Sequence, residues 1–236
     1  TLTDGTPLAE LVDLPYLVKF LAADQPLSIQ AHPTIDHARL GFAAENAAGI
    51  PLDDPRRTYR DANHKPEMLV ALSDFTAMAG FRSPQAAAET FRLLAQLVDD
   101  ADLTAVLQTM ATNLAAGQLK TVFGQLVDTS GPFWQPAGWT KAIFTAVEHH
   151  AIDDEHLANA LAAATIHPDD PGALVMLLMN LSRLAPGEAL FIPSGTIHAY
   201  VSGLGLEVMA TSDNVIRGGL TVKHVDVTEL DKVVTY

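Results

Sequence analysis

The chain has 236 residues, of which 48% are hydrophobic, and it carries a net charge of −14. This composition excludes a disordered chain, and the acidic balance excludes nucleic acids and anionic membranes as expected partners. No apolar run approaches the ~20 residues that span a bilayer, and the chain contains no cysteine. We therefore expect a soluble, cytoplasmic globular protein that does not depend on disulfides.

The first part of the chain predicts short strands around one helix. Between Tyr16 and Phe81, short apolar runs are broken by proline, aspartate and asparagine, as is typical of strands and their connections. An alanine-rich stretch inside this region predicts a helix over residues 34–49. We assign residues 1–82 to the first part of a β domain.

A block of helices is predicted to follow over residues 83–186. Ser83 and Pro84 are typical of an N-cap followed by proline at the first helical position. Apolar residues then recur at helical spacing, and Asp170 is a candidate N-cap for the last helix. That helix is expected to end before the stop signal Ala185-Pro186-Gly187. Within the block, the later helices are expected around residues 140–149, 154–164 and 171–184.

After Gly187 the chain returns to short apolar runs separated by glycine and proline, which predicts antiparallel β structure over residues 187–236. Two separated β segments need each other to bury their faces. The sequence therefore predicts a mainly β barrel or sandwich with an all-α helical insertion, an α+β fold.

Polar residues interrupt the predicted strands at three places. Ser28, Gln30 and His32 alternate, so they share one face of a strand, and Glu67 begins the apolar run that follows Pro66. The third place is the stretch GEALFIPSGTIHAYVS, whose spacing of glycine, proline and histidine matches the second signature motif of cupin barrels, although serine replaces the usual asparagine at its end. A turn in this stretch would deliver His198 to the interior of a strand.

Each of these residues also has an ordinary explanation when taken alone. Gln30 and His32 could lie on a solvated strand face, Glu67 could guard a sheet edge, and His198 could be a satisfied histidine at a sheet rim. Together, however, two imidazole nitrogens, a carboxylate and an amide oxygen complete a tetrahedral set of metal ligands. The sequence therefore predicts a zinc site.

A fourth polar stretch brings Glu207, Asp213, Arg217 and Lys223 among apolar residues and glycines. An ion pair between Glu207 and Arg217 across a hairpin would be an alternative to a functional role. In so acidic a chain, an anionic substrate needs a local basic pocket. The candidates are Lys19, Lys65, Arg217 and Lys223.

Four stretches in this order resemble the type I mannose-6-phosphate isomerase family: SIQAHP, NHKPEM, PSGTIHAY and SDNVIRGGLT, with a helical block between the second and the third. The resemblance implies a cupin-like fold and one zinc ion per chain, with Gln30, His32, Glu67 and His198 as ligands. It also implies that Arg217 is catalytic. Further positions match the pocket of the family: Ser28, His64, Lys65, Glu207, Asp213 and Lys223.

The resemblance implies interconversion of mannose 6-phosphate and fructose 6-phosphate by proton transfer between C2 and C1 through an enediolate. His64, Glu207 and Lys65 are candidates for the general base, and the residues do not rank them. Lys65, Arg217 and Lys223 are candidates for the phosphate. Two alternatives stay open, a cupin metalloenzyme of another reaction class and a non-catalytic sugar-phosphate-binding protein, and we expect a monomer.

Overall fold

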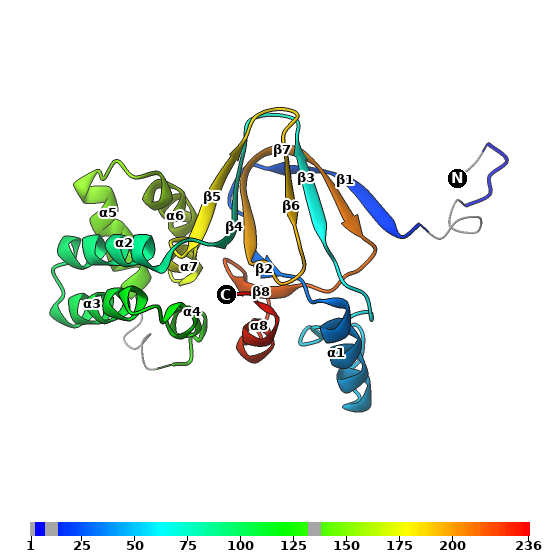
Figure 1. Ribbon diagram of the computed structural model, residues 1–236, viewed down its shortest axis with the longest axis horizontal. Coiled ribbons are helices and arrows are strands. Elements are labelled where there is room, and N and C mark those ends of the chain that lie inside the picture. The colour runs from blue at the N-terminus through cyan, green and yellow to red at the C-terminus, as the bar shows by residue number, and fades with distance from the viewer. Residues whose placement is uncertain (1–2, 8–13, 132–137) are drawn as a thin grey trace.

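The structure, a computed structural model, describes residues 3–7, 14–131 and 138–236. Within these residues the strands form one antiparallel sheet, and eight helices accompany it (Figure 1). The strands are β1 (Tyr16–Ala23), β2 (Ile29–Ala31), β3 (Glu67–Ala71), β4 (Phe75–Phe81), β5 (Met179–Leu184), β6 (Ala189–Ile192), β7 (His198–Ala210) and β8 (Ile216–Gly219). The helices are α1 (Ile35–Ala47), α2 (Pro84–Leu97), α3 (Ala101–Ala115), α4 (Leu119–Val127), α5 (Trp139–His150), α6 (Glu155–Ile166), α7 (Gly172–Met176) and α8 (Val227–Val233).

The long strand β7 joins the two halves of the sheet. Its first residues pair with β2 and β4, and from Gly203 onward it pairs with β1 and β3. At this transition Gly203 has a φ of 121°, and a Cβ atom there would lie 2.6 Å from the backbone oxygen of Asp74. Glycine is therefore needed where β7 changes partners. Both predicted β segments contribute to this one sheet, as expected.

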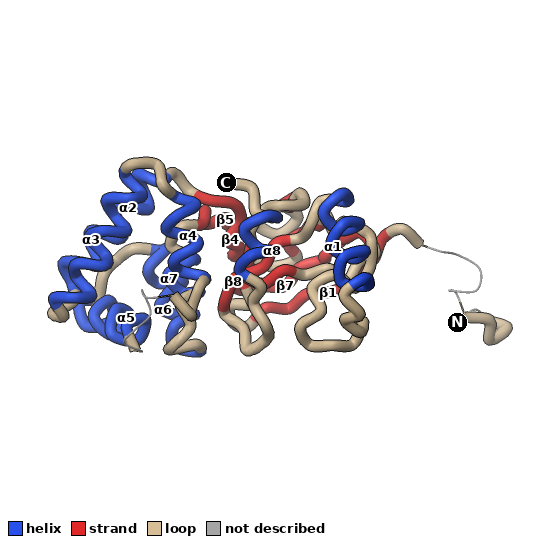
Figure 2. Tube along the Cα trace, turned by 90° about the horizontal axis from the view of Figure 1, so that it is seen from below, coloured by secondary structure: helices blue, strands red, loops and turns tan. Residues whose placement is uncertain are grey.

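Helices α2 to α7 follow one another between β4 and β5, and they gather beside one end of the sheet in both views (Figures 1 and 2). The predicted helix start is confirmed, because Pro84 opens α2 and the Ser83 hydroxyl accepts a hydrogen bond from the Ala86 N–H at 3.2 Å. Phe91 and Leu94 of α2 are fully buried. Among the described residues, every helix is too short or too polar to cross a bilayer.

The prediction of one helix over residues 171–184 is wrong. The helix α7 ends at Met176, and Met179–Leu184 form the strand β5, in which Leu181 lies opposite Met78 of β4. Asp170 is not the N-cap residue, although its Oδ1 accepts a hydrogen bond from the Gly172 N–H at 2.8 Å. A continuous apolar run has no polar face to reveal its period, so its sequence does not distinguish helix from strand. Pairing with the edge of β4 makes residues 179–184 a strand.

Candidate metal centre

Three buried side chains from distant parts of the chain meet where β2 ends and where β3 and β7 begin. His32 follows β2, Glu67 is the first residue of β3, and His198 is the first residue of β7. His32 Nε2 lies 3.0 Å from Glu67 Oε1, and His198 Nε2 lies 3.4 Å from Glu67 Oε2. All three are at most 1% exposed, and their potential ligand atoms lie within 4.8 Å of one another.

Sheet pairing and one turn bring these groups together. Gln30 on β2 lies directly opposite His198 on β7. The turn that leads into β7 is closed by a hydrogen bond from the Thr196 N–H to the Pro193 carbonyl, and Gly195 within it has a φ of 87°. The Gly195 N–H donates to the carbonyl of His32 at 2.8 Å. The turn predicted to deliver His198 is therefore present and is attached to the strand that carries the other histidine.

The Nδ1 atoms of His32 and His198 bond to backbone carbonyls, and these bonds direct both Nε2 atoms toward Glu67. His32 Nδ1 lies 2.8 Å from the carbonyl oxygen of Asn214, and His198 Nδ1 lies 2.9 Å from that of Thr196. A carbonyl oxygen only accepts, so each Nδ1 must donate, and in the neutral rings each Nε2 presents a lone pair toward Glu67. Lone pairs that face a carboxylate repel it unless a cation lies between them. This is the orientation that second-sphere carbonyls give to metal-binding histidines.

The ionisation of these groups suits a cation as well. Burial lowers the pKa of His32, which favours its neutral, metal-binding form. Two neutral nitrogens and one negative carboxylate, with the neutral oxygen of Gln30 on the neighbouring strand, fit the donor set of a zinc site.

Two further ionisable groups flank Glu67. Lys65 Nζ lies 3.1 Å from Glu67 Oε1, and the Tyr200 hydroxyl donates to Glu67 Oε2 at 3.3 Å. Glu207 on β7 is 9% exposed, and burial, followed by the charge of Glu67, raises its pKa. A carboxyl group with a raised pKa is a candidate for general acid–base catalysis.

The remaining predicted site residues lie on β8, in the segments beside it and on the connections that precede β2 and β3. Arg217 on β8 is paired with Gln30 on β2. It lines a cavity of about 730 Å³ together with Asp213 and Lys223. Ser28 is half-buried just before β2, whereas His64 is exposed on the connection to β3. The described residues contain no ion pair between Glu207 and Arg217, so the alternative of a simple hairpin pair finds no support.

A set of polar residues that the sequence did not reveal holds the connections around the site. Asn214 is fully buried, and its side chain bonds to the Arg60 N–H at 2.7 Å and to the carbonyl of Asp61 at 2.9 Å. Asp61 in turn accepts hydrogen bonds from the Ser212 hydroxyl and the Asp213 N–H. These contacts join segments about 150 residues apart. The only signal in the sequence was the presence of small polar residues near the motifs, which is common in loops.

The comparisons with known proteins agree with this geometry. Residues 7–84 match the family model "Phosphomannose isomerase type I, catalytic domain". Over 221 residues, the chain is 39% identical to mannose-6-phosphate isomerase of Escherichia coli K12, covering 92% of this chain and 53% of that protein. It is 31% identical to the human mannose-6-phosphate isomerase over 234 residues, covering 95% of this chain and 52% of that protein.

Solved structures give the same result. A zinc-bound crystal structure of mannose 6-phosphate isomerase superimposes with a TM-score of 0.81 at 38% identity, covering 94% of this chain and 54% of that chain. A mutant of phosphomannose isomerase from Salmonella typhimurium superimposes with a TM-score of 0.83 at 38% identity and the same coverage. The chain thus spans about half the length of the relatives that it matches. Over the part that it spans, the chain is similar in sequence and in structure to type I phosphomannose isomerases.

Proposed function

We propose that this chain provides the zinc site and most of the catalytic centre of an isomerase that interconverts mannose 6-phosphate and fructose 6-phosphate. The observation that carries the proposal is the buried cluster of His32, Glu67 and His198, in which both Nε2 atoms face the carboxylate. Gln30, opposite His198, would be the fourth ligand. When bound, zinc would supply a Lewis acid for the oxygens of the substrate.

The proton transfer between C2 and C1, through an enediol(ate), falls to the side chains beside the ligands. Glu207 is the best-supported base, because its raised pKa keeps it able to exchange a proton. Lys65 contacts Glu67 and would hold or orient an oxygen at the reacting end of the sugar. His64 remains a candidate, although it would have to move from its exposed position.

Recognition of the substrate is assigned to the cavity beside β8. Arg217 is proposed as the catalytic arginine that steadies developing negative charge, and Lys223 as a contact of the phosphate. Asp213, which lines the same cavity, and Ser28, which precedes β2, would bond to hydroxyl groups of the sugar. The similar proteins are named for mannose 6-phosphate, which supports this choice of substrate.

The fold proposed for this function is a cupin-like β domain formed by residues 1–82 and 187–236 together with the strand β5, with the helices α2 to α7 as a helical insertion between β4 and β5. The clustering of α2 to α7 beside one end of the sheet supports that division (Figures 1 and 2). We further propose a monomer in the cytoplasm. Light scattering on the purified chain tests the monomer, and fluorescence microscopy of the tagged chain in its native cell tests the location.

The deciding experiment measures bound metal by mass spectrometry and follows conversion of mannose 6-phosphate to fructose 6-phosphate. The unmodified chain should hold one equivalent of zinc and turn over substrate, whereas Gln30→Ala and Arg217→Ala should lose turnover. Gln30→Ala should also lose zinc, and Arg217→Ala should keep it. Zinc without turnover in the unmodified chain would favour a sugar-phosphate-binding role for this part, and absence of zinc would refute the ligand assignment.

A further inference from the structure

A second arginine, Arg60, shares the cavity of Arg217. The 730 Å³ cavity is bounded by the connection between α1 and β3 and by the segment around β8. Its charged lining includes Arg60, Arg217 and Lys223, together with the carboxylates of Asp53 and Asp213. Among the described residues, no ion pair joins either carboxylate to any of these three cations. The cavity therefore keeps a positive excess in a chain whose net charge is −14.

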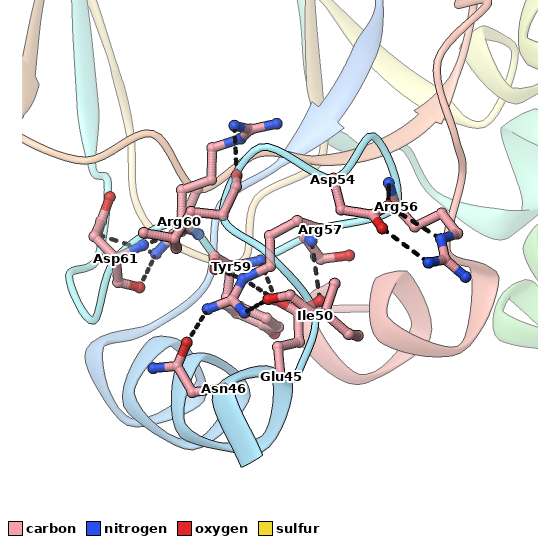
Figure 3. A network of polar contacts seen from close by, with 12 residues as sticks. Glu45, Asn46, Ile50, Asp54, Arg56, Arg57, Tyr59, Arg60 and Asp61 are labelled. Atoms are coloured by element: carbon pink, nitrogen blue, oxygen red, sulfur yellow. Dashed lines mark hydrogen bonds and ion pairs between the residues drawn. The ribbon is translucent and has the colours of Figure 1, made fainter. Parts of the chain in front are cut away.

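Two neighbouring arginines in the connection between α1 and β3 have their charges neutralised by carboxylates. Arg56 forms an ion pair of 2.8 Å with Asp54, and the buried Arg57 forms one of 3.0 Å with Glu45 (Figure 3). The guanidinium of Arg60 instead donates only to the carbonyl of Leu52, at 3.0 Å, among the described residues. Arg60 is thus the member of this trio whose charge has no carboxylate partner.

Arg60 and Arg217 also act on each other. Burial, followed by the positive charge of Arg60, lowers the pKa of Arg217. Two like charges that line one cavity repel each other, and an anion bound between them offsets this repulsion. A cavity that keeps both guanidinium groups therefore favours an anionic occupant with several acceptor oxygens, because the planar donor array of arginine matches such groups bidentately.

The backbone of Arg60 is held in place relative to the metal centre. The buried side chain of Asn214 accepts a hydrogen bond from the Arg60 N–H at 2.7 Å, while the carbonyl of the same residue lies 2.8 Å from His32 Nδ1. Beneath this segment, Arg57 bonds to Asn46 and to the carbonyl of Ile50 (Figure 3). The backbone of Arg60 is therefore held by Asn214, the same residue that orients the candidate metal ligand His32.

We propose that Arg60, together with Lys223, binds the phosphate group of the sugar-phosphate substrate in the cavity that Arg217 also lines. The proposal rests on the proposed function for the identity of the sugar, but the anion site itself follows from the cavity and its uncompensated cations. Binding involves no covalent step. Arg60 would set affinity for the phosphorylated sugar and would leave the proton transfer at the other end of the substrate unaffected.

The test compares Arg60→Gln with Arg56→Gln, a matched control in the same connection whose arginine is already paired with Asp54. In Arg60→Gln, KM for mannose 6-phosphate should rise about 10-fold to 100-fold, as loss of a charged hydrogen bond predicts, with kcat within a few-fold. Affinity for inorganic phosphate, measured by calorimetry, should fall by a similar factor. Arg56→Gln should change neither, and Arg60→Lys should be intermediate because it keeps the charge but not the bidentate geometry.

The calorimetric measurement separates this inference from the proposed function. If Arg60→Gln binds inorganic phosphate as tightly as the unmodified chain, or if the unmodified chain does not bind it, the role of Arg60 is refuted whether or not the chain is active. If the chain lacks isomerase activity but loses phosphate affinity only in Arg60→Gln, the anion site stands and the proposed reaction fails. Circular dichroism on each variant confirms that the fold is retained.

Discussion

The backbone N–H of Gly195 donates a hydrogen bond of 2.8 Å to the carbonyl of His32, which joins the turn before β7 to the end of β2. Gly195 has a φ of 87°, and a Cβ atom there would lie 2.7 Å from Thr235 Oγ1. The turn is therefore both conformationally restricted and closely packed. Any displacement of it would move His32 and His198 relative to each other.

Gly195→Ala should lower the free energy of unfolding by about 1–3 kcal/mol through backbone strain, with an added steric cost. It should also weaken zinc binding, because the turn positions both histidines. Gly187→Ala is the matched control, since Gly187 has a φ of 91° but no atom within 4 Å of the added Cβ. Thermal unfolding and metal titration on both variants check this. Equal zinc affinity in Gly195→Ala and Gly187→Ala would contradict a role of the turn in positioning the ligands.

Removal of metal should destabilise the chain through the buried cluster. A ligand that binds only the folded state stabilises it, so a chelator should lower the Tm of the zinc-loaded chain by about 5–10 °C. His198→Ala should show little response to chelator because it lacks a ligand, whereas His150→Ala, at an exposed position, should respond like the unmodified chain. Scanning calorimetry with and without chelator measures the difference. A full response in His198→Ala would exclude His198 as a ligand.

Glu207→Gln should reduce kcat for mannose 6-phosphate by about 100-fold to 10,000-fold with a much smaller change in KM, as expected when a proton-transfer group is lost. Glu188→Gln is a suitable control, because Glu188 is exposed and its Oε2 only accepts a hydrogen bond from the Ala185 N–H. Steady-state kinetics on both variants give the answer. Near-normal turnover in Glu207→Gln would transfer the role of base to Lys65 or His64.

His156 makes stability depend on pH in a predictable direction. Burial, followed by the charge of Arg82, lowers the pKa of His156 from its ordinary value of 6.5. The unfolded chain then binds the proton more readily than the folded chain, so the contribution to stability is present above pH 6.5 and is lost as pH falls through the lower folded-state pKa. His156→Gln should therefore lose less stability on acidification.

Denaturant titrations of the unmodified chain and His156→Gln at pH 7 and pH 5 measure this difference. His150→Gln serves as the control for removal of an exposed histidine, and it should follow the unmodified chain. The metal centre is the same in all three proteins, so its effect on stability cancels in the comparison. Parallel pH profiles for the unmodified chain and His156→Gln would show that this partly buried histidine does not contribute.

Asp170 connects the helical block to the segment after β8, with Oδ1 accepting from the Gly172 N–H and Oδ2 from the Thr221 N–H. Asp170→Ala should lower the free energy of unfolding by about 1–3 kcal/mol, because both donors lose their partner. The neighbouring Asp169 is exposed, so Asp169→Ala is the control. Chemical denaturation measures both, and equal stability of the two variants would assign no structural role to the Asp170 carboxylate.

Local patterns predicted those features that depend on neighbouring residues. The cap at Ser83 and the alternation that places Glu67 inward and Met68 outward could be read from the sequence because a helix end and a strand face are set within a few residues. The division between α7 and β5 could not, because it depends on the edge of β4, which is distant in the chain. Tertiary pairing overrides local pattern at such places.

The candidate site divides in the same way. His32 and His198 were predicted as ligands from the residues around each of them. The contact of Lys65 with Glu67 and the bonds from Asn214 to Arg60 depend on how loops cross in space, which no local spacing records. Local sequence patterns can thus predict the residues that carry chemistry, but they do not predict the residues that hold those side chains in place.

The bend of β7 at Gly203 has a consequence for how the centre forms. One half of this strand begins with His198, which contacts Glu67, and the other half pairs with β3, which Glu67 opens, so the cluster forms only after pairing is complete on both sides of Gly203. Because these pairings join segments distant in the chain, they are expected to form slowly. Zinc would then bind only after these last pairings have formed, so the rate of zinc binding during refolding would measure the late steps of folding.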